Sequence, residues 1–247
     1  MTERGGPQQI PRPELWTPGA PPPWRHEDSD LITPDRLRHT FDGRTGDPSP
    51  VESVGGAPSA VLIPLYPADD GLNVVLTRRA WTLRTHQGEV SFPGGRADPG
   101  EVPVVTALRE AAEEITLDVS TVVVLGELDH LSTVTRRAYI VPVVALLSDR
   151  PDLAASEAEV EEVLHVPLAE LLHPEVYREE RWGAAPDGRP VHFFELYGDT
   201  IWGATAAMLR QLILLTLGHD PGPRDMWDPA GSCGIWIPPP GYEGKVV

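Results

Sequence analysis

The stretch FPGGRADPGEVPVVTALREAAEEITL, residues 92–117, joins a double-glycine turn to an alanine-rich segment dense in carboxylates. Its alanines and leucine predict a helix over residues 101–115. Glu110 lies three residues before Glu113 and four before Glu114, so all three share one helix face. Like charges at this spacing repel. A solvated helix face is therefore one interpretation, and a bound cation is the other.

Hard divalent cations favour the second interpretation of this carboxylate face. Mg²⁺ prefers oxygen ligands and often bridges protein carboxylates to phosphate. Glu101 adds a carboxylate at the expected first helical turn, and Arg109 can offset part of the repulsion. Glycine permits close backbone approach, so the turn can bring carbonyl oxygens near the helix. The pattern predicts a metal site for attack of water on a phosphoryl group.

The spacing of these residues resembles the Nudix box of the Nudix hydrolases. The matched positions are Gly95, Glu101, Arg109, Glu110, Glu113 and Glu114. Two positions depart from the family pattern: Thr116 replaces an expected glycine, and Ala111 replaces a bulky apolar residue. The resemblance implies an α/β (α+β) fold, a Nudix-type α/β/α sandwich with a mixed sheet between helices. It also implies Mg²⁺ or Mn²⁺ and cleavage of nucleoside diphosphates linked to another moiety.

The resemblance assigns roles by position. Glu110 and Glu114 would be the principal metal ligands, with Glu113 sharing one or more ions and the Gly94 carbonyl as a further ligand. Arg109 would orient the glutamates through Glu101. The catalytic set is therefore expected to be Glu113, Glu114, Arg109 and Glu101. The base would be a box glutamate or a carboxylate of a later loop, for which the candidates are Glu157, Glu159, Glu161 and Glu162.

The residues before the box, VLTRRAWTLRTHQGEVSFPGG (75–95), resemble the upstream signature of the coenzyme A pyrophosphatase branch. The matched positions are Leu76, Thr77, Arg79, Ala80, Arg84, Gly88 and 92–95. With later segments, the resemblance covers roughly residues 58–217. It implies hydrolysis of coenzyme A or its thioesters to 3′,5′-ADP and 4′-phosphopantetheine. The alternatives are a Nudix hydrolase of ADP-ribose, NADH or another nucleotide, and a non-catalytic nucleotide sensor.

Three arginines concentrate positive charge ahead of the carboxylate helix in an otherwise acidic chain. Arg78, Arg79 and Arg84 are expected to bind substrate phosphates, because guanidinium groups donate paired hydrogen bonds to them. Strand alternation predicts that either Arg78 or Arg79 faces solvent instead. His86 is a further candidate for substrate contact or for a structural role. For Trp81, stacking on an adenine and covering the core both remain open.

The remaining pattern predicts three regions. Residues 1–55 are rich in proline and glycine and form an arm that packs on the core or on a partner, with a short helix capped by Thr33. Disorder is the alternative for the first twenty residues. Residues 56–218 form the Nudix hydrolase domain, starting with strands at 59–66 and 72–80. It ends with an amphipathic helix capped by Asp199 or Thr200. Residues 219–247 form an irregular tail.

Composition limits the classes of partner. A net charge of −17 and a pI of about 4.8 argue against nucleic-acid and membrane binding, leaving a small nucleotide as the expected partner. Cys233 is the single cysteine, which excludes an internal disulfide framework. A cytoplasmic location is the expectation. A homodimer is plausible for the fold.

Overall fold

Two β-sheets enclose one long helix in the computed structural model, which describes residues 4–49, 58–133, 138–184 and 188–222. Cys233 and most of the predicted tail lie outside these ranges. Among the described residues, no helix is long and apolar enough to cross a membrane.

The larger sheet forms around two long strands, β2 (Pro58–Ala68) and β3 (Gly71–Arg79), which pair as an antiparallel hairpin. Its strands follow the order β4-β3-β2-β8-β6, and β5, β7 and β9 pair with β2, β8 and β3 respectively. β2 and β8 run parallel, so the sheet is mixed, as expected. The bounds of its other strands are β4 Val90–Ser91, β5 Gly94–Arg96, β6 Val123–Glu127, β7 Leu131–Ser132, β8 Tyr139–Leu146 and β9 Val160–Pro167.

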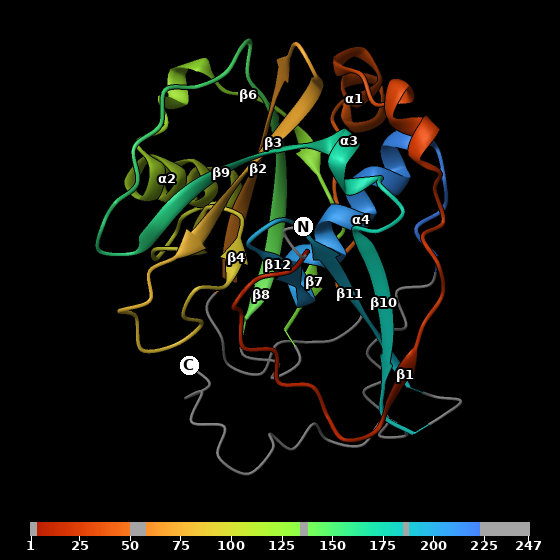
Figure 1. The fold of residues 1–247 in the computed structure, drawn as a ribbon. Helices are drawn as coiled ribbons and strands as arrows, with labels where there is room; N and C mark the ends of the chain where they lie inside the picture. Colours follow the sequence, from red (N-terminus) through yellow and green to blue (C-terminus); the bar gives the residue numbers. More distant parts are fainter. Residues whose placement is uncertain (1–3, 50–57, 134–137, 185–187, 223–247) are drawn as a thin grey trace.

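Strand periodicity gives this sheet two apolar faces. On β2, Leu62 and Tyr66 belong to one buried cluster, whereas Ile63 and Leu65 belong to the other. Successive side chains of a strand point to opposite faces, so each face must be covered by other elements. Helix α2 (Pro103–Ile115) covers the first face, while α1 (Pro34–Phe41), α3 (Leu168–Leu171) and α4 (Gly203–Leu217) lie on the second (Figure 1).

Small side chains set the position of α2 on the sheet. Ala107 and Ala111 are fully buried against the apolar face of β2 and β8, together with Ile115. Alanine at these positions leaves room for the close packing of helix on sheet. Ala111, where the family pattern has a bulky apolar residue, therefore lies on the packed face of α2, away from the carboxylates of this helix.

The smaller sheet was not predicted from the sequence pattern. It has the order β1-β10-β11-β12, with bounds β1 Trp16–Pro18, β10 Tyr177–Trp182, β11 Arg189–Glu195 and β12 Thr200–Trp202. Of these strands, only β11 lies in a segment whose sequence predicts a strand, RPVHFFELYG (189–198). β10 (YREERW) escaped notice because its charged residues mask the alternation, yet Glu179 and Glu180 are both buried as ion-pair partners.

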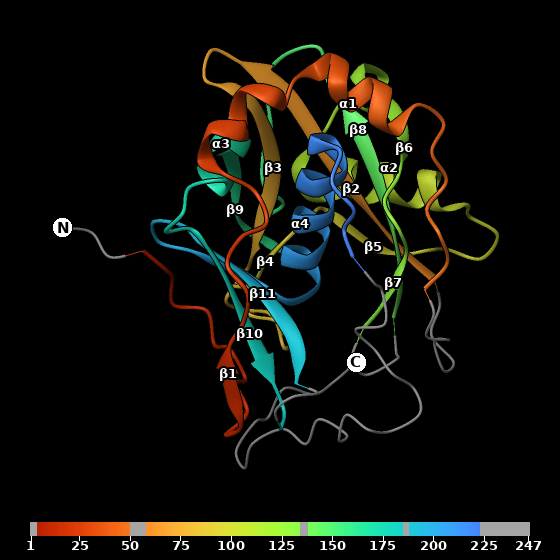
Figure 2. The same cartoon turned by 90° about the vertical axis from the view of Figure 1, so that its right-hand side faces the viewer.

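The last helix differs from the expectation in its start and in its exposure. Asp199 and Thr200 do not cap α4, because Thr200–Trp202 form β12 and the helix begins at Gly203. Its apolar side chains are buried almost all round, since α4 lies between the two sheets (Figure 2). Its end was predicted correctly: Gly218 caps it in the left-handed conformation.

The N-terminal arm packs on the core. Thr33 caps α1 as predicted, accepting a hydrogen bond from the Arg36 backbone N–H at 3.2 Å. Leu37 and Phe41 of this helix are fully buried in the same cluster as α4. Trp24, before the helix, stacks near Phe194 of β11 with 6.1 Å between ring centroids. The arm thus supplies core residues for both sheets.

Candidate active site

Glu101 lies just before α2 rather than in its first turn. The helix begins at Pro103, and Glu101 accepts hydrogen bonds from the Asp98 backbone N–H at 3.0 Å and from Thr106 Oγ1 at 2.9 Å. Arg109, two turns along the helix, donates to both oxygens of Glu101, at 2.9 Å and 3.0 Å. These hydrogen bonds lower the pKa of Glu101 to about 2. Glu101 therefore remains a carboxylate at any working pH.

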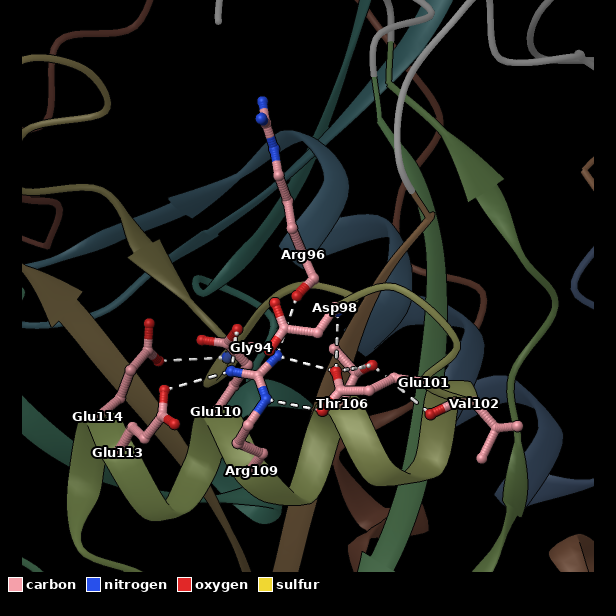
Figure 3. Close-up of polar contacts among 10 residues, drawn as sticks. All are labelled: Gly94, Arg96, Asp98, Glu101, Val102, Thr106, Arg109, Glu110, Glu113 and Glu114. Atoms are coloured by element: carbon pink, nitrogen blue, oxygen red, sulfur yellow. Dashed lines mark hydrogen bonds and ion pairs between the residues drawn. The ribbon is translucent and has the colours of Figure 1, made fainter.

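Arg109 lies at the centre of the carboxylate face (Figure 3). Besides Glu101, its Nη1 contacts Glu110 at 2.8 Å and Glu113 at 3.2 Å, and its Nη2 donates to the Arg96 carbonyl at 3.0 Å. These contacts raise its pKa, Glu101 contributing most. The guanidinium fork thus fixes two helix carboxylates relative to the loop before the helix.

Glu114 is the buried member of the face. Its residue is 6% exposed, and one carboxylate oxygen accepts a hydrogen bond from the Gly94 backbone N–H at 3.2 Å. Burial raises its pKa to about 7, although the charge of Arg79 and this hydrogen bond oppose the shift. Because ionisation costs energy there, Glu114 is the carboxylate that gains most from a nearby cation.

The double glycine permits the approach of turn and helix. A Cβ on Gly95 would lie 2.5–2.6 Å from the carboxylate atoms of Glu110, and one on Gly94 would lie 2.4 Å from the Ala60 carbonyl oxygen. The turn is held to β2 by the Leu62 N–H, which donates to the Pro93 carbonyl at 2.9 Å. Only glycine therefore fits at position 94 against the sheet, and a side chain at position 95 would displace the Glu110 carboxylate.

The donor set fits a hard divalent cation in chemistry but is not assembled around one. Within the described ranges, no three carboxylate, histidine or cysteine side chains converge as metal ligands would. Arg109 instead bridges Glu110 and Glu113, and Glu114 points to the glycine turn (Figure 3). All the donors are oxygens, the type Mg²⁺ and Mn²⁺ prefer, and one of them is a buried carboxylate that holds a proton near neutrality.

The end of β3 separates the two neighbouring arginines. The pairing of β3 with β9 shifts register between Arg78 and Arg79, which re-aims the second side chain. The charge of Arg79 acts on Glu114, and its buried Nε has no hydrogen-bond partner among the described residues. Arg78 instead forms ion pairs with Asp199 at 2.6 Å and Glu162 at 2.7 Å. Neither arginine therefore simply faces solvent.

The loop of residues 80–89 carries the remaining predicted substrate residues. Arg84 and His86 are both exposed, and His86 pairs with Glu89 at 2.8 Å, a contact that raises the His86 pKa. Trp81 is 38% exposed and covers Gly88, where a Cβ would lie 2.1 Å from the indole. The structure thus brings Arg79 to the carboxylates and leaves Arg84 and His86 on the loop surface.

The later loop of residues 154–159 contacts the end of α2. The Ser156 N–H donates to the Glu114 backbone carbonyl at 2.8 Å, and the Ala154 N–H donates to that of Ile115 at 3.2 Å. Of the four downstream carboxylates, Glu159 is the one whose charge raises the Glu114 pKa, whereas Glu162 is bound to Arg78. Glu157 and Glu161 are exposed.

Sequence patterns did not reveal Gln8 or the true role of Asp199 in this region. The sequence pattern predicts Asp199 as a helix cap, yet its buried carboxylate binds Arg78 and the Gln8 amide. Gln8 lies in a proline- and glycine-rich segment without periodicity. Its partners are distant in sequence: Gly88 is 80 positions away and Asp199 is 191 positions away. No local signal could have indicated such contacts.

Comparison with known proteins identifies the class. The NUDIX domain model matches residues 56–186, more than half of the chain, so this protein belongs to the Nudix family. Nudix hydrolases act on phosphoric anhydride bonds and generally use divalent metal ions such as Mg²⁺ or Mn²⁺. The mixed sheet between helices is that of a Nudix α/β/α sandwich.

Several relatives can be named. Nudix hydrolase 22, chloroplastic, of Arabidopsis thaliana is 44% identical over 160 residues, covering 61% of this chain and 52% of the relative. The uncharacterized Nudix hydrolase NudL of Photorhabdus laumondii is 38% identical over 156 residues, covering 62% of this chain and 82% of the relative. The chain thus spans about half of the first and most of the second. The solved structure of a Nudix hydrolase from M. smegmatis aligns with a TM-score of 0.41 and 22% identity, covering 48% of this chain and 77% of the other.

Proposed function

We propose that this protein hydrolyses the diphosphate of coenzyme A or its thioesters, releasing 3′,5′-ADP and 4′-phosphopantetheine or acyl-phosphopantetheine. The observation that carries the proposal is the position of Arg79, whose buried Nε has no hydrogen-bond partner among the described residues and whose charge acts on Glu114. Arg79 belongs to the upstream signature, Glu114 belongs to the box, and the charge of one acts on the other at the end of β3. The positive charge that we propose for phosphate binding thereby acts on one of the proposed metal-binding carboxylates.

Glu110, Glu113 and Glu114, with the Gly94 carbonyl, would hold a Mg²⁺ or Mn²⁺ ion. When bound, such an ion supplies positive charge that binds the diphosphate and favours attack by water. Arg109 holds Glu110 and Glu113 in place through its own anchor on Glu101. Glu159 is the carboxylate that we propose as the base, because its charge reaches Glu114 from the facing loop.

In this proposal, each of the three arginines has a different role. Arg79 would donate to the diphosphate, using the buried Nε that has no hydrogen-bond partner within the described residues. Arg84 is exposed on the neighbouring loop and would meet the separate 3′-phosphate, with His86 beside it. Arg78 would support β3 and the loop, since Asp199 and Glu162 already bind its guanidinium group.

The test is a substrate panel of coenzyme A, acetyl-coenzyme A, ADP-ribose and NADH with Mg²⁺ or Mn²⁺. Products are identified by mass. We expect 3′,5′-ADP from the coenzyme A compounds. Glu114→Gln should lower kcat by roughly a hundredfold or more because a buried ligand loses its charge. Arg79→Gln should raise KM for coenzyme A.

The other outcomes separate the rival functions. Cleavage of ADP-ribose or NADH alone would retain the proposed metal site and overturn the proposed substrate. Tight nucleotide binding without turnover in excess metal would overturn the hydrolase and favour a sensor. Glu157→Gln, an exposed carboxylate on the same loop as Glu159, is the matched control for Glu159→Gln. It should retain wild-type kcat while Glu159→Gln loses most of it.

A further inference from the structure

Residues 4–8 of the arm form a strap across the segment between β11 and β12. The Gly5 N–H donates to the Leu196 carbonyl at 2.7 Å, and the Gly6 N–H donates to Thr200 Oγ1 at 3.0 Å. Arg4 fixes the outer end of the strap by an ion pair with Glu170 at 2.6 Å. The strap is therefore held at both ends by polar contacts, close to the loop of residues 80–89.

Gln8 is the point at which the strap contacts that loop. Its Nε2 donates to the Gly88 carbonyl at 2.9 Å and to Asp199 Oδ1 at 2.8 Å, while its Oε1 accepts from the Thr200 N–H at 2.8 Å. The residue is 7% exposed. Both amide hydrogens and the oxygen are thus bound, as a buried amide requires.

The Gly88 carbonyl lies where the loop returns to the sheet. The Gly88 N–H donates to the Arg79 carbonyl at 3.2 Å, and the Arg79 N–H donates to the Glu89 carbonyl at 2.9 Å. Gly88 has φ +65° and lies against Trp81, so no residue with a Cβ fits there without displacing the indole. A contact on Gly88 therefore acts on the backbone that positions Arg79.

The second partner of Gln8 reaches the same strand end. Asp199 binds Arg78 through two hydrogen bonds, at 2.8 Å and 2.6 Å, and its side chain is 5% exposed. Arg78 also binds Glu162 of β9 at 2.7 Å. The amide of Gln8 thus joins the loop to an ion-pair network that spans β3 and β9, in which Asp199 is buried and Glu162 is exposed.

We infer that Gln8 is a positioning residue for substrate binding, which it supports by fixing the loop of residues 80–89 over the end of β3. The inference rests on the proposed function, in which Arg79 and Arg84 bind substrate phosphates. Within the described structure, Gln8 forms no hydrogen bond with either arginine side chain. It acts through the Gly88 carbonyl and through Asp199, so its loss alters substrate affinity while the carboxylates on α2 keep their contacts.

The experiment compares Gln8→Met and Gln8→Glu in the full chain. Methionine keeps the length of the side chain and removes all three hydrogen bonds. Glutamate keeps the acceptor for Thr200 and places a carboxylate beside Asp199. Both should raise KM for coenzyme A roughly tenfold, as expected for losing one or two net hydrogen bonds, with kcat within about twofold of wild type.

Arg12→Ala is the matched control on the same arm. Arg12 binds Glu180 of β10, with Nε to Oε2 at 3.0 Å, and contacts neither Gly88 nor Asp199 in the described structure. It should leave KM unchanged. A second readout does not need activity: the initial rate of trypsin cleavage after the exposed Arg84, followed by mass. This rate should rise severalfold in Gln8→Met and stay at the wild-type value in Arg12→Ala.

The outcomes distinguish the inference from the proposed function. Unchanged KM and unchanged cleavage at Arg84 in a folded Gln8→Met protein would overturn the inference. An equal rise of KM in Arg12→Ala would also overturn it, because the effect would then be general to the arm. If the wild-type protein turns over no nucleotide, the proposed function fails, and the cleavage rate alone still decides whether Gln8 fixes the loop.

Discussion

At the scale of single residues, the buried carboxyl of Glu114 makes the stability of the metal-free protein depend on pH near neutrality. Its pKa rises from 4.5 to about 7 on folding because burial disfavours the charged form. The folded state therefore binds more protons than the unfolded chain between these values. The contribution of Glu114 to stability is fully present below pH 4.5 and is lost as pH rises through 7.

This sign gives a prediction for the metal-free protein. Between pH 4.5 and 8, in EDTA, the free energy of unfolding should fall relative to Glu114→Gln by about 3 kcal/mol. Urea denaturation of both proteins at each pH measures the difference, and the glutamine variant subtracts all other titrating groups. Added Mg²⁺ should reverse the fall at pH 8. A difference that rises with pH in EDTA would contradict the assignment.

At the scale of elements, the end of α2 is strained where glycine would be relaxed. Thr116 caps the helix with φ 56° and ψ 32°, the left-handed region that β-branched residues avoid. Its Oγ1 donates to the Ala154 carbonyl at 3.0 Å, which ties the later loop to the helix. The departure from the family pattern thus exchanges backbone relaxation for one hydrogen bond between the helix and this loop.

Two substitutions separate these effects. Thr116→Val keeps the strain and loses the hydrogen bond, whereas Thr116→Gly loses both. We expect the free energy of unfolding of the glycine variant to be about 1–2 kcal/mol higher than that of the valine variant. It should be close to that of the wild-type protein. Denaturant unfolding at fixed pH makes the comparison. A valine variant as stable as the glycine variant would show that the left-handed cap carries no strain.

At the scale of the whole molecule, the arm is part of the core. Phe41 is fully buried in the cluster that α4 shares with both sheets. Phe41→Ala should therefore lower the free energy of unfolding by about 3–5 kcal/mol, the usual cost of deleting a buried phenylalanine ring. Leu15→Ala, on the same arm but 65% exposed, is the control and should change it by less than about 0.5 kcal/mol.

The shape of the unfolding curve carries further information. If the arm and the Nudix region share one core, both variants should unfold in a single transition with tryptophan fluorescence and circular dichroism coinciding. A Phe41→Ala protein that keeps wild-type stability would show that the arm packs loosely. Separate transitions would show that the two regions fold independently.

Local pattern alone determined much of the carboxylate helix. The helix predicted over 101–115 spans Pro103–Ile115, and its carboxylates share one face because helical periodicity fixes this relation within one turn or two. The contact of Arg109 with Glu101 was implied by the family resemblance, and it joins the helix to the loop before it. The strands at 59–66 and 72–80 follow for the same reason, since alternation and turn chemistry are local. The roles of these residues in metal binding and catalysis stay predictions.

Tertiary structure decided what lies far apart in sequence. The pairing of β1 with β10, the packing of α4 against the larger sheet and the pairing of Arg78 with Asp199 depend on contacts across more than a hundred residues. Gln8 reaches Gly88 for the same reason. From sequence alone, a charged residue is expected to be exposed to solvent, because its partner in the folded chain is not known. The ion pair between Arg78 and Asp199, and the burial of Asp199, are therefore visible only in the folded chain, which brings the two residues together.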